Sequence, residues 1–321
     1  MSGRTVLIAG AAGQDGRLLA GRLVAEGQRV IGLVRPERLG APDLPCPCVS
    51  LALDDSDAMA ALVEAVRPDR FFYLAAVHHS SEGPALPDPD LQRAMVATNL
   101  VGVTAAIRAI LRHAPACRLV YAGSSHMHRA GDQDRAVDAD SPRDPVNYYG
   151  LTKSWAMDAI RFARDQQGLA GGTAILFNHE SPLRPDSFLS RKLSVAAARI
   201  KAGLAESVSI RNIGAKADWF DAEDAVDAMI RMGDADTPAD HAIGAGVLTG
   251  VRDLAAAAFA AAGLDWTRHV TWEADLTRPA LYADIRQTHE ALGWTPRTDL
   301  GALMRRMVEA DLARIAAARP A

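Results

Sequence analysis

Tyr149 and Lys153 are the two residues of this 321-residue chain whose types and spacing most directly indicate chemistry. Residues four apart share one face of a helix, so the phenol and the ammonium can reach the same ligand. A nearby ammonium stabilises a phenolate and lowers a phenol pKa that is ordinarily about 10. We therefore expect Tyr149 to act as a general acid and base at a hydroxyl or carbonyl group. Lys153 would stand beside it or bind a ribose.

Two serines, Ser124 and Ser125, follow the run Arg118–Ala122, which has the β-branched and aromatic composition of a strand. Ligands of parallel sheets bind beyond the carboxyl ends of the strands. We therefore place both serines beside Tyr149 and Lys153 in one candidate catalytic site.

A glycine-rich turn lies between the first apolar run and the first helical pattern of the chain. Its glycines, Gly10, Gly13 and Gly16, follow the strand-like run Thr5–Ala9 and precede the helical pattern Asp15–Glu26. Glycines at this position let the backbone approach a pyrophosphate, whose charge is then stabilised by the helix N-terminus. The turn therefore predicts a dinucleotide cofactor, the alternative being an ordinary strand-to-helix turn.

The end of the second strand bears on which dinucleotide is bound. NAD-binding domains usually place a carboxylate here for the ribose hydroxyls, whereas a cation accommodates a 2'-phosphate. No Asp or Glu lies between Gly27 and Pro36, and Arg35 and Arg38 follow the strand. We therefore predict NADP, with NAD as the alternative if Arg35 points to water.

Strand and helix patterns alternate up to Phe177 and become irregular after it. This rhythm predicts an α/β fold, a Rossmann-like doubly wound parallel sheet covered by helices on both faces. We predict an NADP-binding domain over residues 1–177 and a smaller α/β substrate-binding lobe over 178–321, with some later segments returning to the first domain. The further elements expected are strands over 29–34, 70–74, 173–177 and 208–210, and helices over 56–66 (capped by Ser56), 91–113, 148–167, 188–202, 223–232, 251–262 and 300–318.

Composition excludes several classes of partner. A net charge of -4 and a pI near 6.1 give no general attraction to nucleic acids or acidic membranes. No apolar run approaches the roughly 18 residues needed to span a bilayer, and the first strand leaves no room for a signal peptide. Cys46 and Cys48, which we expect in a proline-rich loop, have the wrong spacing for a zinc site. With Cys117, they are expected to be reduced thiols. We expect a cytoplasmic protein without a metal.

Together, the glycine turn, the serines after the later strand and the YxxxK pattern resemble the extended short-chain dehydrogenase/reductases over essentially the whole chain. Within that group the chain is similar to the GDP-mannose 4,6-dehydratase family. The segments that carry this closer resemblance are Gly13-Gln-Asp-Gly16, Leu176-Phe-Asn-His-Glu-Ser-Pro182, Arg191-Lys192, Ala215-Lys216, Asp218-Trp219 and Arg278-Pro279.

The resemblance implies ligands, partners and site residues. It implies a nucleotide-sugar substrate linked to GDP, and a homodimer or tetramer formed by long helices, here over 91–113 and 148–167. The cofactor contacts that it adds are Gln14, Asp15, Leu53, Ala75, Asn178 and His179. The substrate contacts that it implies are Asn178, Arg191, Lys192, Lys216, Trp219 and Arg278. A GDP-linked substrate carries a diphosphate, and guanidinium groups suit a diphosphate because they form two parallel hydrogen bonds with it.

One departure from the family concerns catalysis. The dehydratases have a carboxylate two residues after the catalytic serine or threonine, where it removes the C5 proton and helps expel the C6 hydroxyl. In this register Ser124 takes the hydroxyl's place and His126 the carboxylate's. A neutral imidazole can act as a base near neutral pH, whereas the family's chemistry assigns both duties to a carboxylate, which puts dehydration in doubt. Ala52, Ala217 and Leu281 also depart from the pattern.

Three hypotheses follow. The first is hydride transfer at the sugar C4, as in a 4-dehydrogenase, a 4-keto reductase or an epimerase. The second is a 4,6-dehydratase in which His126 or another group is the base. The third is a regulator that binds a nucleotide sugar or NADP without turnover, against which the intact Tyr149 and Lys153 argue.

Overall fold

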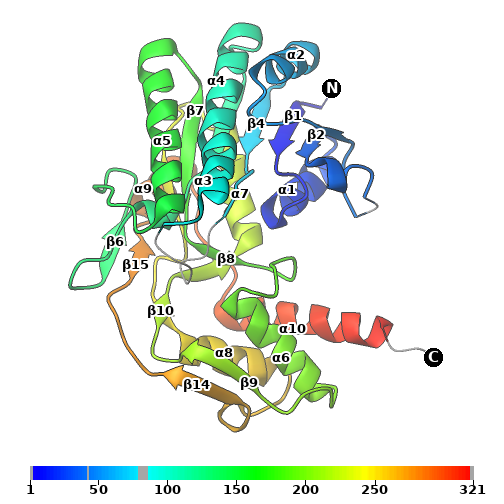
Figure 1. The fold of residues 1–321 in the computed structure, drawn as a ribbon, viewed down its shortest axis with the longest axis vertical. Helices are drawn as coiled ribbons and strands as arrows, with labels where there is room; N and C mark the ends of the chain where they lie inside the picture. Colours follow the sequence, from blue (N-terminus) through cyan, green and yellow to red (C-terminus); the bar gives the residue numbers. More distant parts are fainter. Residues whose placement is uncertain (1–2, 42, 79–85, 319–321) are drawn as a thin grey trace.

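Seven parallel strands form the central sheet of the protein (Figure 1). The computed structural model describes residues 3–41, 43–78 and 86–318. In the order β12-β7-β5-β4-β1-β2-β3, neighbouring strands pair in parallel throughout, which confirms the predicted fold class. In chain order these strands are β1 Thr5–Ala9, β2 Arg29–Val34, β3 Cys48–Ser50, β4 Arg70–Tyr73, β5 Arg118–Ala122, β7 Gly171–Leu176 and β12 His241–Ile243.

Helices cover both faces of this sheet, which explains why its strands are almost continuously apolar. One face packs against α1 (Gln14–Ala25) and α7 (Ala222–Asp234), with α9 (Arg286–Leu292) nearby. The other packs against α2 (Ser56–Val66), α4 (Gly102–His113) and α5 (Tyr148–Gln167). β12 is a strand of the large sheet, and α7 packs on the same face as α1. The chain therefore returns to the large sheet after leaving it at residue 177.

The long helix expected over 91–113 is interrupted by a change of winding. It consists of α3 (Pro89–Val96), a π-helical segment η2 (Ala97–Val101) and α4. The run Pro89–His113 is long and apolar enough to cross a membrane, so the prediction that no apolar run approaches that length was wrong. Half of its most apolar window is buried inside the protein, as in the core helix of a folded domain.

The second lobe lies below the carboxyl edge of the sheet in Figure 1. Its apolar core joins α6 (Leu189–Lys201), α8 (Val251–Ala261) and α10 (Leu300–Ala317) to a parallel pair, β9 (Val208–Asn212) and β14 (Val270–Ala274). The remaining short pairs are β6 (Arg135–Val137) with β15 (Leu281–Ala283), β8 (Asn178–Glu180) with β11 (Trp219–Asp221), and β10 (Lys216–Ala217) with β13 (Thr249–Gly250). Single helical turns lie at η1 (Pro36–Arg38), η3 (Ser125–Met127) and η4 (Trp266–Arg268).

Two local predictions need correction. The cap of α2 is Asp55 and not Ser56, because the Asp55 carboxylate accepts hydrogen bonds from the backbone N–H groups of Asp57 and Ala58. Cys48 begins the edge strand β3 and does not lie in a loop. Two- and three-residue strands carry no periodicity, so the sequence offers no signal for them.

Candidate functional site

The glycine turn forms the tight junction between β1, α1 and β4. Gly10 has φ +88°, and a Cβ there would lie 2.7 Å from the backbone nitrogen of Ala75. A Cβ on Gly16 would meet the Gly10 carbonyl oxygen and lie 2.7 Å from the Ala11 Cα. Both positions therefore require glycine, one for its backbone conformation and both for close backbone approach.

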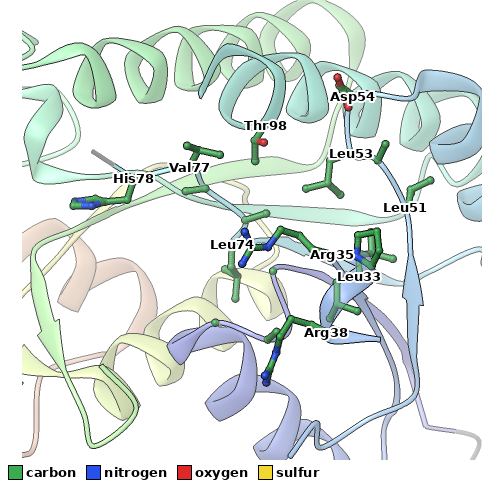
Figure 2. Close-up of a pocket in the computed structure, with 18 residues that line it drawn as sticks. Leu33, Arg35, Arg38, Leu51, Leu53, Asp54, Leu74, Val77, His78 and Thr98 are labelled. Carbon is green, nitrogen blue, oxygen red and sulfur yellow. The ribbon is translucent and has the colours of Figure 1, made fainter. Parts of the chain in front are cut away.

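A cavity of about 730 Å³ opens beside this turn along the carboxyl edge of the sheet. Figure 2 shows it extending from the end of β2, past Leu53, to Val77 and His78. Its lining contains five of the predicted cofactor contacts, which are Gly10, Gly13, Arg35, Leu53 and Ala75. Its volume lies in the usual range for cofactor sites, about 300–1,000 Å³. The cavity and its glycine cradle therefore fit a dinucleotide.

Two arginines line the cavity at the end of β2. The Arg35 side chain is 82% exposed and lies 3.1 Å from Glu37. Arg38 donates to both carboxylate oxygens of Asp43 at 2.9 Å. Arg35 is thus the more accessible of the two guanidinium groups for a 2'-phosphate.

A hydrogen-bond network joins the start of α1 to β8 of the second lobe. The amide of Gln14 donates to the His179 carbonyl oxygen at 3.1 Å and accepts from Ser181 at 2.7 Å. The Asp15 carboxylate lies 3.0 Å from Nε2 of His179. Burial opposes charge on both groups, yet their mutual attraction lowers the pKa of Asp15 and raises that of His179. These predicted cofactor residues thus fix the glycine turn against the following lobe.

The first turns of α5 bring Tyr149 and Lys153 together. The Lys153 ammonium lies 5.6 Å from the centroid of the Tyr149 ring and donates to the Ala122 carbonyl oxygen at 2.7 Å. Its side chain is 1% exposed, whereas Tyr149 is only partly buried. The pair therefore stands at the carboxyl end of β5, where the sequence places it.

Burial decides the charge of both groups. It raises the pKa of Tyr149, and it lowers the pKa of Lys153 to about 7. The expectation that the protein's own ammonium lowers the phenol pKa was therefore wrong, because burial raises the pKa of Tyr149 by more than neighbouring positive charge lowers it. Arg184 acts in the lowering direction on Tyr149, but more weakly than burial.

Replacing Lys153 with Met is expected to change how stability depends on pH. The unfolded chain holds a proton on Lys153 up to about pH 10.4, whereas the folded protein releases it near pH 7. The wild type should therefore gain stability relative to the variant as the pH rises from about 7 to 10. Melting temperatures of both proteins across this range provide the measurement. A constant difference would contradict the buried, readily neutralised amine.

Two imidazoles accompany Tyr149. The ring centroid of His78, which lines the cavity, is 5.0 Å from that of Tyr149, and the centroid of His126 is 5.9 Å from it. A Cβ on Gly150 would collide with the His126 carbonyl oxygen, so η3 packs directly on the start of α5. Ser124 caps η3 by accepting from the His126 N–H at 3.2 Å, and Ser125 is the first residue of that turn.

Three neighbouring residues were missed by the sequence reasoning. Buried Asn99 donates to the Val77 carbonyl and the Thr152 hydroxyl, both at 3.1 Å, and so joins the cavity wall to α5. Its only local signal is the π-helical segment, which often marks functional positions. Asn147 caps α5, and Arg184 stacks over Phe188, whose ring contacts His78.

The predicted substrate residues lie in two different environments. Asn178 and Trp219 are directly paired in register between β8 and β11. Arg191 is 5% exposed, pairs with the Asp311 carboxylate and lies 3.4 Å from Asp186. Both terminal nitrogens of the Arg191 guanidinium therefore face carboxylates inside the second lobe, which favours a structural role over a diphosphate contact. Lys192 lies on the exposed side of α6.

Asp134 contacts the two segments that carry the remaining predicted cations, Lys216 and Arg278. Its carboxylate accepts from the Lys216 ammonium at 2.5 Å and from the Ala280 N–H at 3.0 Å. Arg278 is exposed on the segment leading to Ala280. Lys216 and Arg278 therefore lie on two segments that Asp134 joins by hydrogen bonds.

Comparisons with known proteins identify the family and the fold. The model of the family "GDP-mannose 4,6 dehydratase" matches residues 7–307. The GDP-mannose 4,6 dehydratase 1 of Arabidopsis thaliana is 30% identical over 96% of this chain and 90% of its own length. RMD from Pseudomonas aeruginosa complexed with NADPH (TM-score 0.81, 19% identity, 97% and 100% coverage) shares the fold. UDP-glucose 4-epimerase from Brucella ovis in complex with NAD also shares the fold. Its TM-score is 0.81 at 20% identity, and the match covers 96% of this chain and 98% of that one.

Proposed function

Because the chain belongs to the GDP-mannose 4,6-dehydratase family, we propose that it is an NAD(P)-dependent enzyme that oxidises or reduces a GDP-hexose at C4. This activity includes a 4-dehydrogenase, a 4-keto reductase and a 4-epimerase. The observation that carries the proposal is the intact Tyr149 and Lys153 pair beside the glycine-cradled cavity, with an imidazole instead of a carboxylate at residue 126.

The proton chemistry belongs to Tyr149. A bound nicotinamide supplies the acceptor or donor of the C4 hydride. A phenol with a raised pKa is protonated at neutral pH, which is the form needed to donate to the oxygen of a 4-keto sugar. In the opposite direction the phenolate, which is the form left after that donation, takes the proton of the 4-hydroxyl and becomes the phenol again. Lys153 holds the helix start against the Ala122 carbonyl. Ser124, which accepts from the His126 N–H, is the hydroxyl proposed to orient the sugar oxygen.

The second lobe supplies the residues proposed for the nucleotide and diphosphate. Asn178 and Trp219 lie side by side at its junction with the large sheet, and Lys216, Lys192 and Arg278 are its accessible predicted cations. Diphosphate binding requires cations to replace lost hydration. Lys216 would then exchange its Asp134 partner for the ligand.

The dehydratase hypothesis keeps support from the family, because the family description and the Arabidopsis thaliana relative both carry that name. It requires a base for the sugar C5 proton, and the side chain proposed for it is His126, which lies beside Tyr149 and takes the carboxylate's position in the sequence register. A regulator that binds without turnover is the third reading.

Product analysis separates these readings. The protein is incubated with GDP-mannose or related GDP-sugars and NADP or NAD, and with 4-keto GDP-sugars and NADPH, followed by mass spectrometry and sugar NMR. A gain or loss of two hydrogens, or a C4 epimer of unchanged mass, is expected. Loss of water from the sugar would contradict this proposal and show a dehydratase. Tight binding without turnover would contradict it and show a regulator. The variant His126→Glu, which restores the family's carboxylate, provides the matched comparison for elimination.

Replacing Arg35 with Ala is expected to weaken NADPH binding by about 10-fold or more and to leave NADH binding unchanged. A charged hydrogen bond to a phosphate contributes about 1.5–3 kcal/mol, and only NADPH carries the 2'-phosphate. Fluorescence titration with both cofactors measures the difference. Arg29→Ala, an exposed arginine at the start of β2, is the control. Equal losses for NADH and NADPH would contradict the assignment.

The exposed faces of α4 and α5 are proposed to pair two copies of the chain. Phe162 is 61% exposed and borders a depression of about 510 Å³ that also contains Ile107 and Leu111. Replacing Phe162 with Glu is expected to convert a dimer into a monomer, as measured by light scattering at matched concentration. Val247→Glu, at an equally exposed apolar position (59%) between β12 and β13, should remain dimeric. A dimer that persists in Phe162→Glu would locate the interface elsewhere.

A further inference from the structure

Asn147 makes two side-chain hydrogen bonds, and the acceptor role of its oxygen in one fixes the donor role of its nitrogen in the other. Its side-chain oxygen accepts from the backbone N–H of Gly150 at 2.9 Å and so caps α5. Its side-chain nitrogen lies 3.3 Å from Nδ1 of His126. A backbone N–H can only donate, so the cap requires the amide oxygen on that side and directs the amide NH₂ to the imidazole.

The amide orientation determines the protonation of the ring. An NH₂ group is a donor, so Nδ1 of His126 must accept, with its lone pair toward Asn147. In a neutral imidazole the single proton then resides on Nε2. Burial lowers the pKa of His126, so this neutral form is the one present near neutral pH.

The surroundings hold the ring in this arrangement. The backbone N–H of His126 donates to Ser124 at 3.2 Å, and its carbonyl oxygen accepts from the Val146 N–H at 3.1 Å. The imidazole stands at 89° to the Tyr149 ring, with centroids 5.9 Å apart. His126 is therefore fixed beside the proposed acid and base.

We propose that Asn147 is a positioning residue that locks His126 in its Nε2–H tautomer, so that this histidine meets the sugar as a hydrogen-bond donor and not as a base. The role toward the sugar rests on the proposed function, whereas the tautomer does not. A donor can support an oxygen at C4 or a neighbouring hydroxyl while Tyr149 exchanges the proton. Removal of a carbon-bound C5 proton requires an available nitrogen lone pair, and the only one on this neutral ring is directed to Asn147.

The tautomer can be measured on the whole protein by long-range ¹H–¹⁵N NMR of the histidine rings. The chain has nine histidines, so the His126→Gln variant identifies the signal. At about pH 9, well above the ordinary histidine pKa of about 6.5, the wild type should show a protonated Nε2 and an unprotonated Nδ1. A protonated Nδ1, or a mixture of both tautomers, would overturn the proposal.

Asn147→Asp is the informative variant because it keeps the cap and reverses the polarity toward the ring. An aspartate oxygen still accepts from Gly150 N–H, but a carboxylate cannot donate to Nδ1. The proton of His126 should therefore move to Nδ1, with the melting temperature showing that the fold is kept. An unchanged tautomer in this variant would remove Asn147 from the role, since a merely structural residue would leave the ring signals as they are.

A deuterium experiment tests the consequence for the sugar. Turnover of a GDP-sugar by the wild type in D₂O should leave the C5 hydrogen unexchanged, as followed by mass spectrometry and NMR. Exchange at C5 on the timescale of turnover would show a base at this position and contradict the donor role. If no GDP-sugar is turned over at all, the proposed function fails, whereas the tautomer is still decided by the ring signals.

Discussion

Replacing Tyr149 with Phe is expected to lower kcat for the GDP-sugar by at least about 100-fold, because a positioned general acid or base contributes about 10²–10⁴ in rate. The substitution removes one oxygen and keeps the aromatic contacts with His78 and His126. Binding of NADPH should therefore change little, and the loss should appear in kcat and kcat/KM alike. Steady-state kinetics together with a cofactor titration provide the measurement.

Tyr148→Phe is the matched control for this prediction. Tyr148 is the preceding residue of the same helix, but its ring packs edge-on against Trp155, with centroids 6.5 Å apart and planes at 82°. This control should keep nearly full activity. Activity of Tyr149→Phe within tenfold of the wild type would refute the acid and base assignment.

Replacing Gly16 with Ala is expected to abolish measurable NADPH binding and to lower the melting temperature by about 5 °C or more. The new Cβ would collide with the Gly10 carbonyl oxygen and lie 2.7 Å from the Ala11 Cα. Both obstacles are backbone atoms, so α1 must move away from the turn that cradles the cofactor. Calorimetry and fluorescence titration measure the two effects separately.

The same helix offers a control at Gly21, where a Cβ would have only the Pro45 side chain near it, at 4.0 Å. Gly21→Ala should therefore stabilise the protein by about 0.5–1 kcal/mol, since alanine is the better helix former, and keep cofactor binding. If Gly16→Ala binds NADPH as well as Gly21→Ala does, the cradle has been misplaced.

Strong local patterns explain what the sequence could predict. The helix Tyr148–Gln167 is predicted to the residue, and the strand Thr5–Ala9 likewise, because periodicity and bounding turns act within a few residues. The parallel sheet follows from alternating strands and helices, and the family resemblance is confirmed by the match over residues 7–307. The predicted roles of the site residues stay predictions, although the structure brings Tyr149 and Lys153 together.

Long-range contacts explain what the sequence could not predict. Arg191 pairs with the buried carboxylate of Asp311, 120 residues away in sequence, so this partner cannot be read from the residues around Arg191. The neutralising effect on Lys153 comes from burial by several elements and cannot be read from YxxxK spacing. Asn99 is invisible for the same reason, since its partners Val77 and Thr152 lie on other segments.

The most direct test of the central claim is a crystal structure of the protein with NADP and a GDP-hexose bound. We predict that the dinucleotide fills the cavity beside Gly10 and that the sugar O4 lies within hydrogen-bonding distance of the Tyr149 hydroxyl. A dinucleotide bound elsewhere, or a Tyr149 hydroxyl directed away from the sugar, would contradict it.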